Sequence, residues 1–555
     1  MTELLIVIVT ALLVIAASAI AGPRLGVASP LVLVALGVAA SFLPVFDSVH
    51  IEPEWILEGL LPPLLYSSAV SMPSMNFRRE FGAISGLSVL LVVGTALVLG
   101  VFFMLVIPDL GFAWGVALGA IISPTDAVAT SIVKQTSVSK RVLAMLDGES
   151  LLNDATALVL LRTAIVATAA AFSFWGAVGT FAYAVLVAVV IGGVVGRLNL
   201  VVRKRVTDSA VNTVLSFTVP FVASVPAELL GGSGLVAAVV AGLITGFRAP
   251  RDLSPRNRLS DTQNWGTIEL VLEGVVFLTL GLQIRSILAN VHHDHGGVGT
   301  AVLIAAGALI LTILVRAAYV SPLLVYLNAR VRRGELLQPR LQDMQEKMST
   351  PEGKQEMFEH AGKRRRVSER QLDRLGVRIT RGLANIEYFL REPLGRREGA
   401  AVVWAGMRGA VTVAAAQTLP EDTPQRSVLV LIAFAVALIS LLVQGGTLGP
   451  LLRRLPSDVD QAEVDAQTSA ELTRVMHMLR TAAETVPEPP HPDGEPTQQT
   501  FTDAKRHRLA VIDAQRSALL DARDDGTFDA DVLDNALANL DAAQIAIELR
   551  GKLST

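Results

Sequence analysis

The sequence predicts an all-α polytopic membrane protein. Three observations support this fold class. Of the 555 residues, 52% are hydrophobic and only 17% are charged. Long apolar stretches recur along the chain, and basic residues gather in every second connection between them. Such a composition departs from that of soluble domains, so much of the surface must face lipid. The sequence has no cysteine, which excludes disulfides and thiolate chemistry, and nothing in its charge pattern points to nucleic acid.

The apolar stretches are long enough to cross a bilayer. A spanning helix needs about 20 apolar residues, because the hydrocarbon core is about 30 Å thick. We count about thirteen such stretches, of which the ninth is the shortest. They are residues 4–21, 28–45, 54–72, 82–107, 111–134, 139–170, 174–200, 209–230, 234–247, 265–290, 298–327, 398–418 and 425–451.

Basic residues predict the orientation, since Lys and Arg in short loops stay on the cytoplasmic side. Here they follow the odd-numbered stretches, which places the N-terminus outside and the C-terminus in the cytoplasm of a multi-pass cell-membrane protein. They are Arg24, Arg78, Arg79, Lys134, Lys140, Arg141, Arg203, Lys204, Arg205, Arg248, Arg251, Arg256, Arg258, Arg330, Arg332 and Arg333. No basic residue precedes the first stretch, so we expect a retained helix there rather than a signal peptide.

The polar segments predict two further regions. We expect residues 1–452 to form one transmembrane domain, interrupted by a basic, helix-prone cytoplasmic insert at about 329–397, and residues 453–555 to form a cytoplasmic helical tail. The run from Lys363 to Arg366 is either a solvated surface or a contact for anionic lipid or a regulator. The tail is either regulatory or supports a dimer.

A few ionisable residues within the apolar stretches are expected to lie at membrane depth. Each costs about 3 kcal/mol or more at membrane depth, so each needs a partner or a purpose. The acids are Asp126, Glu149, Asp154, Glu269 and Glu273, and the bases are Arg162, Arg316 and Arg408.

Pro124 lies in the middle of the fifth stretch, in Ser123-Pro124-Thr125-Asp126. Because proline has no amide hydrogen and crowds the carbonyl of Ala120, we expect the helix to kink or unwind there. The freed carbonyls and the Asp126 carboxylate are hard oxygen ligands, which suit a small alkali cation. A simple proline kink with a hydrogen-bonded aspartate is the alternative.

The sixth stretch places two polar pairs on helical faces. Ser150 lies one turn from Asp154, and Glu149 one turn from Asn153. Burial disfavours the charged form of Asp154, so this carboxylate can hold a proton or a cation in turn. Because the two exclude one another and the Asn153 amide does not titrate, the pattern predicts electroneutral exchange of a monovalent cation for a proton.

Four motifs carry a resemblance to the sodium/proton exchanger family shared by bacteria and animals, over about residues 1–452. They are Ser123-Pro124-Thr125-Asp126, Gly148-Glu149-Ser150-Leu151-Leu152-Asn153-Asp154, Leu272-Glu273-Gly274-Val275-Val276-Phe277 with Gly281-Leu282-Gln283, and Gly406-Met407-Arg408-Gly409-Ala410-Val411. The resemblance implies a secondary transporter rather than an enzyme, serving pH homeostasis as a homodimer in the bilayer. It also implies inverted six-helix repeats, with the fifth and twelfth helices broken and crossing at mid-membrane.

The resemblance also implies the site. Asp154 is the main carboxylate for cation and proton, Thr125, Asp126 and Ser150 are further Na⁺ ligands, and Asn153 orients them. No cofactor is implied beyond the transported Na⁺ and H⁺. Structural ion pairs are implied between Glu149 and Arg316, and between Glu273 and Arg408. Some relatives carry a glutamate after the Pro62-Pro63 pair where this chain has Ser67 and Ser68, so the choice among Na⁺, Li⁺ and K⁺ stays open.

Other functions have weaker support in the sequence. A K⁺/H⁺ antiporter would use the same oxygen ligands, and a cation channel would lack obligatory proton coupling. Gly231-Gly232-Ser233-Gly234 fits an intramembrane serine protease, but no histidine falls inside an apolar stretch to act as its base. His292-His293-Asp294-His295 is either a metal site or a solvated external turn.

Overall fold

The computed structural model describes residues 2–25, 27–43, 52–126, 128–136, 138–169, 174–293, 297–350, 369–456, 461–489 and 498–549. All regular secondary structure in these ranges is helical, which confirms the predicted all-α class. The run from Lys363 to Arg366 lies outside the described residues, as do Asp294 and His295 of the histidine motif.

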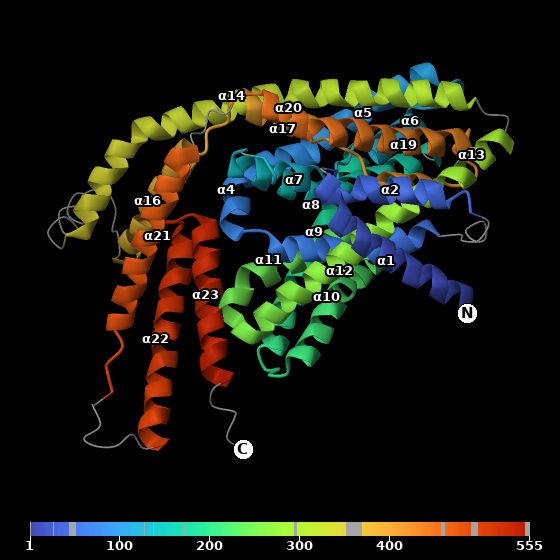
Figure 1. Ribbon diagram of the computed structural model, residues 1–555. Helices are drawn as coiled ribbons and strands as arrows, with labels where there is room; N and C mark the ends of the chain where they lie inside the picture. The colour runs from blue at the N-terminus through green and yellow to red at the C-terminus, as the bar shows by residue number, and fades with distance from the viewer. Residues whose placement is uncertain are drawn as a thin grey trace. The chain divides into compact units, whose positions relative to one another are not determined.

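The helices follow one another along the chain with short connections (Figure 1). They are α1 (Thr2–Leu25), α2 (Ser29–Ala40), α3 (Leu61–Ser71), α4 (Ser74–Ser85), α5 (Val92–Val106), α6 (Phe112–Ile122), α7 (Val128–Val133), α8 (Lys140–Ala169), α9 (Phe174–Arg203), α10 (Ser209–Leu229), α11 (Gly234–Asp252), α12 (Pro255–Leu282), α13 (Ile284–His293), α14 (Val298–Ser349), α16 (Glu369–Arg391), α17 (Arg396–Trp404), α18 (Ala410–Gln417), α19 (Arg426–Ser440), α20 (Gly446–Arg454), α21 (Gln461–Glu484), α22 (Gln498–Asp525) and α23 (Ala530–Leu549). Short π-helical segments at Trp55–Leu60, Gly86–Leu91 and Leu441–Gly445 join continuous helices.

Each predicted apolar range contains helix, but the number of crossings is not settled by helix length alone. Among the described residues, 9 helical segments are long and apolar enough to cross a membrane, and Ser29–Ala40 and Phe112–Ile122 are shorter apolar helices. The fifth and twelfth ranges are each divided into two short helices, α6 with α7 and α17 with α18. Each of these four helices is too short to cross a membrane alone, so the two ranges are not among the 9 segments. The thirteen crossings therefore stay a prediction.

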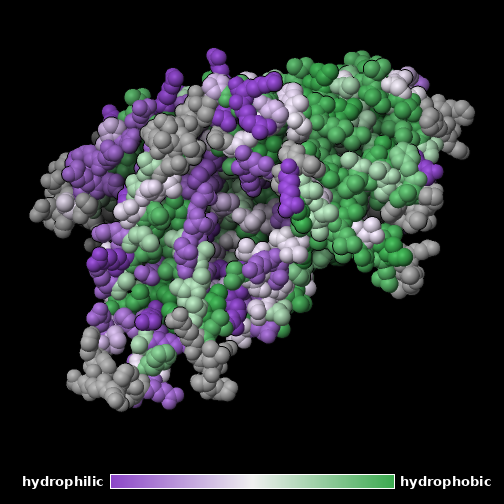
Figure 2. Space-filling model, in the orientation of Figure 1, coloured by the Kyte–Doolittle hydropathy of each residue, from purple (hydrophilic) through white to green (hydrophobic). Residues whose placement is uncertain are grey.

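The chain divides into two compact units. The first unit consists of Met1–Leu253, Leu259–Leu323 and Gly395–Ser457. Its long helices expose many large apolar side chains, including Leu105, Leu303 and Leu314. Figure 2 shows a broad hydrophobic surface of this kind, as expected of helices that face lipid.

The second unit consists of Ser254–Arg258, Leu324–Leu394 and Asp458–Thr555. It joins the insert and the tail, which the sequence analysis had treated as separate regions. Arg391 on α16 pairs with Glu471 on α21 at 3.0 Å. Asp541 on α23 accepts from both Arg258 and Arg516. Helices α21, α22 and α23 lie side by side in Figure 1, so the tail is a small helical bundle.

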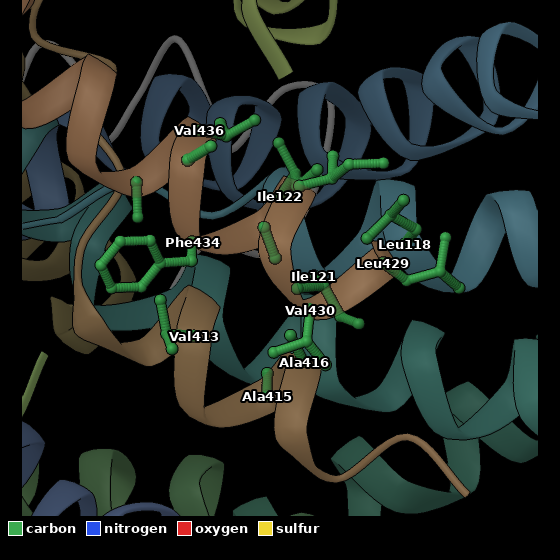
Figure 3. Close-up of a cluster of buried hydrophobic side chains, with 14 of the residues drawn as sticks. Leu118, Ile121, Ile122, Val413, Ala415, Ala416, Leu429, Val430, Phe434 and Val436 are labelled. Atoms are coloured by element: carbon green, nitrogen blue, oxygen red, sulfur yellow. The ribbon is translucent and has the colours of Figure 1, made fainter. Parts of the chain in front are cut away.

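The main hydrophobic core of the first unit surrounds α6. Leu118 and Ile121 pack with Leu429 and Val430 of α19, and Val413 of α18 lies next to Phe434 (Figure 3). All of these residues are buried. The dense packing of such a core holds the ends of the short helices in place.

Two buried ion pairs in the first unit were not predicted. Arg141 contacts Glu80 at 2.6 Å, with both side chains 1% exposed. Arg203 pairs with Asp261 and donates to the Asn212 side chain at 2.8 Å. The sequence analysis had counted Arg141 and Arg203 among the loop charges. The structure shows that each lies within the protein, because helices that extend beyond the predicted apolar stretches bring an arginine and an acid from neighbouring helices together.

The Glu80–Arg141 pair gives a test of stability. Removing one partner of a buried pair strands the other charge and costs about 3–5 kcal/mol. We therefore expect Glu80→Gln to lower the thermal unfolding midpoint of the purified protein in detergent. Asp343→Asn is the control, because its pair with Lys347 is exposed and contributes about 0–1 kcal/mol. An unchanged unfolding midpoint for Glu80→Gln would show that the buried pair does not contribute to stability as expected.

Candidate cation-binding site

Two interrupted helices meet at the centre of the first unit. Helix α6 ends at Ile122 and α7 begins at Val128, while α17 ends at Trp404 and α18 begins at Ala410. The backbone N–H of Asp126 donates to the carbonyl of Met407 at 2.7 Å, so the two interruptions touch. Pro124 explains the first interruption, since it removes an amide donor. The Asp126 carboxylate accepts from the Val128 N–H at 3.0 Å and so caps α7.

Positive side chains lie at the ends of the helices before each interruption. Arg408 donates to the carbonyl of Ile122 at 2.9 Å and also bonds to the Gly406 carbonyl. Arg316 donates from Nε to the carbonyl of Val402 at 2.7 Å. The last carbonyls of a helix have no partner in the helix and carry a partial negative charge. The two guanidinium groups therefore stabilise the buried C-terminal ends of α6 and α17.

Glu149 and Arg316 form a bidentate ion pair, as the resemblance implies. The two nitrogens of Arg316 lie 2.5 and 2.7 Å from the two carboxylate oxygens of Glu149. The Thr125 hydroxyl donates to the same carboxylate at 3.1 Å. All three side chains are buried. Glu149 thus ties α8 to α14 and to the first interruption.

Arg408 and Glu273 do not pair in this structure, which differs from the pair that the resemblance implies. Arg408 is buried, and its guanidinium donates instead to the backbone carbonyls of Ile122 and Gly406 in the interrupted helices. Glu273 is half-buried and interacts with the carboxylates of Asp126 and Glu269. No described cation pairs with Glu273. A sequence motif cannot show this, because the acceptors of Arg408 are backbone atoms.

Asn153 joins α8 to the interruption between α6 and α7. Its amide nitrogen donates to the Thr125 carbonyl at 3.0 Å and to the Thr125 hydroxyl at 2.8 Å. The side chain is fully buried. Through these two hydrogen bonds, Asn153 fixes the position of Thr125 and so holds α8 against the first interruption.

Asp154 differs from the other acids at this centre. It is only 8% exposed, and no described residue donates a hydrogen bond to its carboxylate or pairs with it. The carboxylate of Asp126 lies close enough to repel it electrostatically. Ser150, one turn before it, is half-buried and donates to the Asp147 carbonyl at 3.0 Å. A buried carboxylate without a donor requires a proton or a cation.

Glu269 occupies a place that the sequence did not predict for it. Its carboxylate accepts from the Ser67 hydroxyl at 2.9 Å. Ser67 is one of the two serines that stand where some relatives were expected to carry a glutamate, so a carboxylate from α12 lies beside this region. The contact joins residues distant in sequence, and no local pattern could have revealed it.

A helical membrane protein with two touching helix interruptions around a buried carboxylate has the construction of an ion-coupled transporter. The sodium/hydrogen exchanger transmembrane domain matches residues 8–347 and 374–454. The chain therefore belongs to the sodium/hydrogen exchanger family, as the sequence motifs predicted.

Several relatives show how far this similarity extends. The uncharacterized Na⁺/H⁺ exchanger Rv2287 of Mycobacterium tuberculosis is 26% identical, over 98% of this chain and 96% of the relative. A sodium, potassium, lithium and rubidium/H⁺ antiporter of Bacillus subtilis is 31% identical, over 48% of this chain and 41% of the relative. The sodium proton antiporter MjNhaP1 of Methanocaldococcus jannaschii shares the fold, with a TM-score of 0.54 and 16% identity, covering 82% of this chain and 99% of that one.

The contact between the two interruptions predicts a strict requirement for glycine at position 409. A Cβ atom there would overlap the Asp126 carboxylate. We expect Gly409→Ala to abolish cation-dependent proton movement in liposomes, because Asp126 must leave its cap on α7. Gly94→Ala is the control, because its Cβ would meet nothing within 4 Å. Wild-type exchange by Gly409→Ala would show that the two interruptions do not pack as described.

Proposed function

We propose that this protein is a secondary antiporter that exchanges Na⁺ for H⁺, with both ions competing for the carboxylate of Asp154. The observation that carries the proposal is the burial of Asp154 without a hydrogen-bond donor, next to the contact between two interrupted helices. The ionised carboxylate accepts a dehydrated cation, and protonation releases it. If the empty charged site does not cross the membrane, the two fluxes are coupled without any further device.

The proposed ligands are the side-chain oxygens that the family resemblance implies. Asp154 and Asp126 supply negatively charged carboxylates, and Ser150 supplies a hydroxyl. Thr125 supplies a lone pair of its oxygens that is not used in its contacts with Asn153 and Glu149. Oxygen ligands of this kind suit alkali cations. Asn153 orients the ligands through Thr125 and adds no exchangeable charge.

Potassium or lithium is the second candidate cation. The relative from Bacillus subtilis is named for sodium, potassium, lithium and rubidium, and the ligand set proposed here has no feature that rejects a larger ion. Liposome exchange with Na⁺, K⁺ and Li⁺ compared at several pH values measures the preference. The orientation, the homodimer, the cell-membrane location and the role in pH homeostasis stay predictions from the sequence.

Replacing the proposed carrier carboxylate tests the assignment. We expect Asp154→Asn to abolish sodium-dependent proton movement while the protein still elutes as a folded species in detergent, because the amide is neutral and removes no donor contact. Asp252→Asn is the matched control in the first unit, since Asp252 is partly exposed and lies 3.9 Å from Lys204. Retained exchange by Asp154→Asn would refute the mechanism.

Stoichiometry provides a separate test. If one carboxylate carries one Na⁺ in one direction and one H⁺ in the other, no net charge crosses the membrane. The rate of exchange should then not depend on the membrane voltage. An unbalanced charge crossing about 100 mV changes the driving energy by about 2.3 kcal/mol, so valinomycin-clamped liposomes measure this directly. A voltage-dependent rate would contradict electroneutral exchange.

If the voltage dependence were present in the wild type and disappeared in Glu273→Gln, the second titrating group would be Glu273. Cation flux without proton movement would indicate a channel.

A further inference from the structure

A second polar centre in the first unit involves none of the residues at the two interruptions. It joins α3, α9, α10 and α12, and its main contact is the buried pair of Arg203 and Asp261. Trp265, one turn after Asp261, donates from its indole N–H to the Ser216 hydroxyl at 2.9 Å. The Trp265 ring lies 5.0 Å from that of Tyr66, centroid to centroid. We call these five residues the polar cluster, and all five are buried.

Three atoms of the polar cluster have no hydrogen-bond partner among the described residues. They are the hydroxyl oxygen of Tyr66, Nη1 of Arg203 and Oδ1 of Asp261. Arg203 and Asp261 bond through their other atoms, and Arg203 also donates from Nε to Asn212 at 2.8 Å. The side chains of Tyr66 and Arg203 are fully buried. Because an unsatisfied buried polar atom is costly, such atoms in proteins are bonded to protein or to ordered water.

The three atoms lie around the Ser216 hydroxyl. Ser216 is a neighbour of both Tyr66 and Asp261, and Tyr66 is close enough to both members of the ion pair for their charges to act on its hydroxyl. Tyr66 comes from α3, Arg203 from the end of α9 and Asp261 from α12. Polar atoms from three helices therefore converge at one point.

Apolar side chains pack around the polar cluster. Tyr66 and Trp265 belong to a buried hydrophobic group that includes Val219 and Ala241. Phe217 packs edge-on against Trp265, with ring centroids 5.2 Å apart. In these surroundings the attraction between a polar atom and its partner is strong, and the cost of leaving the atom without one is high.

The chemistry of the three atoms selects a neutral ligand. Nη1 of Arg203 can only donate, Oδ1 of Asp261 can only accept, and the Tyr66 hydroxyl can do either. Arg203 would repel a cation and Asp261 would repel an anion. A water molecule matches all three atoms, because it can accept from Arg203 and donate to Asp261 at the same time. Buried waters in proteins typically make about three hydrogen bonds to groups of this kind.

We propose that Tyr66, Arg203 and Asp261 hold a bound water molecule that joins α3 to the ion pair between α9 and α12. The water completes the hydrogen bonds of all three side chains. Asp261 and Glu269 lie two turns apart on α12, and Glu269 accepts from Ser67, the residue that follows Tyr66 on α3. The bound water therefore helps to fix α12 against α3 where α12 presents Glu269. The inference does not depend on the proposed antiport function.

Radical footprinting of the purified full-length protein detects such a water. Hydroxyl radicals that X-rays generate from a bound water oxidise the side chains next to it, even where bulk solvent is excluded. We expect Trp265 to be oxidised although it is only 4% exposed. Phe103, which is buried in the apolar core around α6, should stay unlabelled.

Substitution of the tyrosine separates a bound water from other sources of radicals. Tyr66→Phe should cause the loss of most Trp265 oxidation, because the water loses one of its three partners. Tyr183→Phe is the matched control, since the Tyr183 hydroxyl is exposed and donates to the Leu230 carbonyl. Absence of Trp265 oxidation in the wild type would overturn the proposal. Equal oxidation in the wild type and Tyr66→Phe would also overturn it, because water would then reach the ring by another route.

A double-mutant cycle tests whether the water joins the side chains. Tyr66→Phe and Asp261→Asn are introduced singly and together, and the thermal unfolding midpoint is measured in detergent. A shared water makes the two effects non-additive. We expect Tyr66→Phe to lower the midpoint of the wild type and to have little effect once Asp261→Asn is present. Additive effects would show that no water joins the two side chains.

A density map of the wild-type protein tests the site without any substitution, and it decides the question if Asp261→Asn does not fold. At a resolution that shows ordered water, we expect a peak within hydrogen-bonding distance of the Tyr66 hydroxyl, Nη1 of Arg203 and Oδ1 of Asp261. A map in which these atoms bond directly to one another, with no peak between them, would overturn the proposal.

Discussion

The structure depends on one constraint, which is that a helix interrupted inside a membrane must have its freed backbone groups satisfied by protein. The interruptions at residues 123–126 and 405–409 meet this requirement jointly. The Asp126 N–H donates to the Met407 carbonyl, and the Asp126 carboxylate caps α7. Arg408 donates to the Ile122 carbonyl at the end of α6. Neither interruption would be stable alone, because each supplies the partner of the other.

This constraint explains why most charges near the centre are structural. Arg316 contacts both the end of α17 and the Glu149 carboxylate, and Glu149 also accepts from Thr125. These contacts fix α8 and α14 against the two interruptions. The apolar core around Leu118 and Phe434 packs against the same interrupted helices (Figure 3). Arg316, Glu149 and Thr125 are themselves buried, so their contacts form in a low dielectric, where an unsatisfied partner is expensive.

The sequence predicted those features that depend on local pattern. Apolar stretches of sufficient length located the helices, and Pro124 located one interruption, since its chemistry acts on its own turn. The features that the sequence missed depend on distant residues. The partner of Arg408 is the Ile122 carbonyl, which no motif records. Arg141 and Arg203 read as loop charges because their acids, Glu80 and Asp261, lie 61 and 58 residues away.

Glu273 and Asp154 both lack a cation partner among the described residues, and their surroundings distinguish them. Glu273 is half-buried, interacts with two other carboxylates, and lies on α12, a helix that continues without interruption. Asp154 is more deeply buried and lies on α8, the helix that Asn153 and Glu149 attach to the first interruption. In the proposed mechanism, a cation bound at Asp154 would change the charge next to Asp126, whose backbone contacts the second interruption. Occupancy of the carboxylate would then be linked to the packing of the two interrupted helices, which is what a transporter needs if ion binding is to change its conformation.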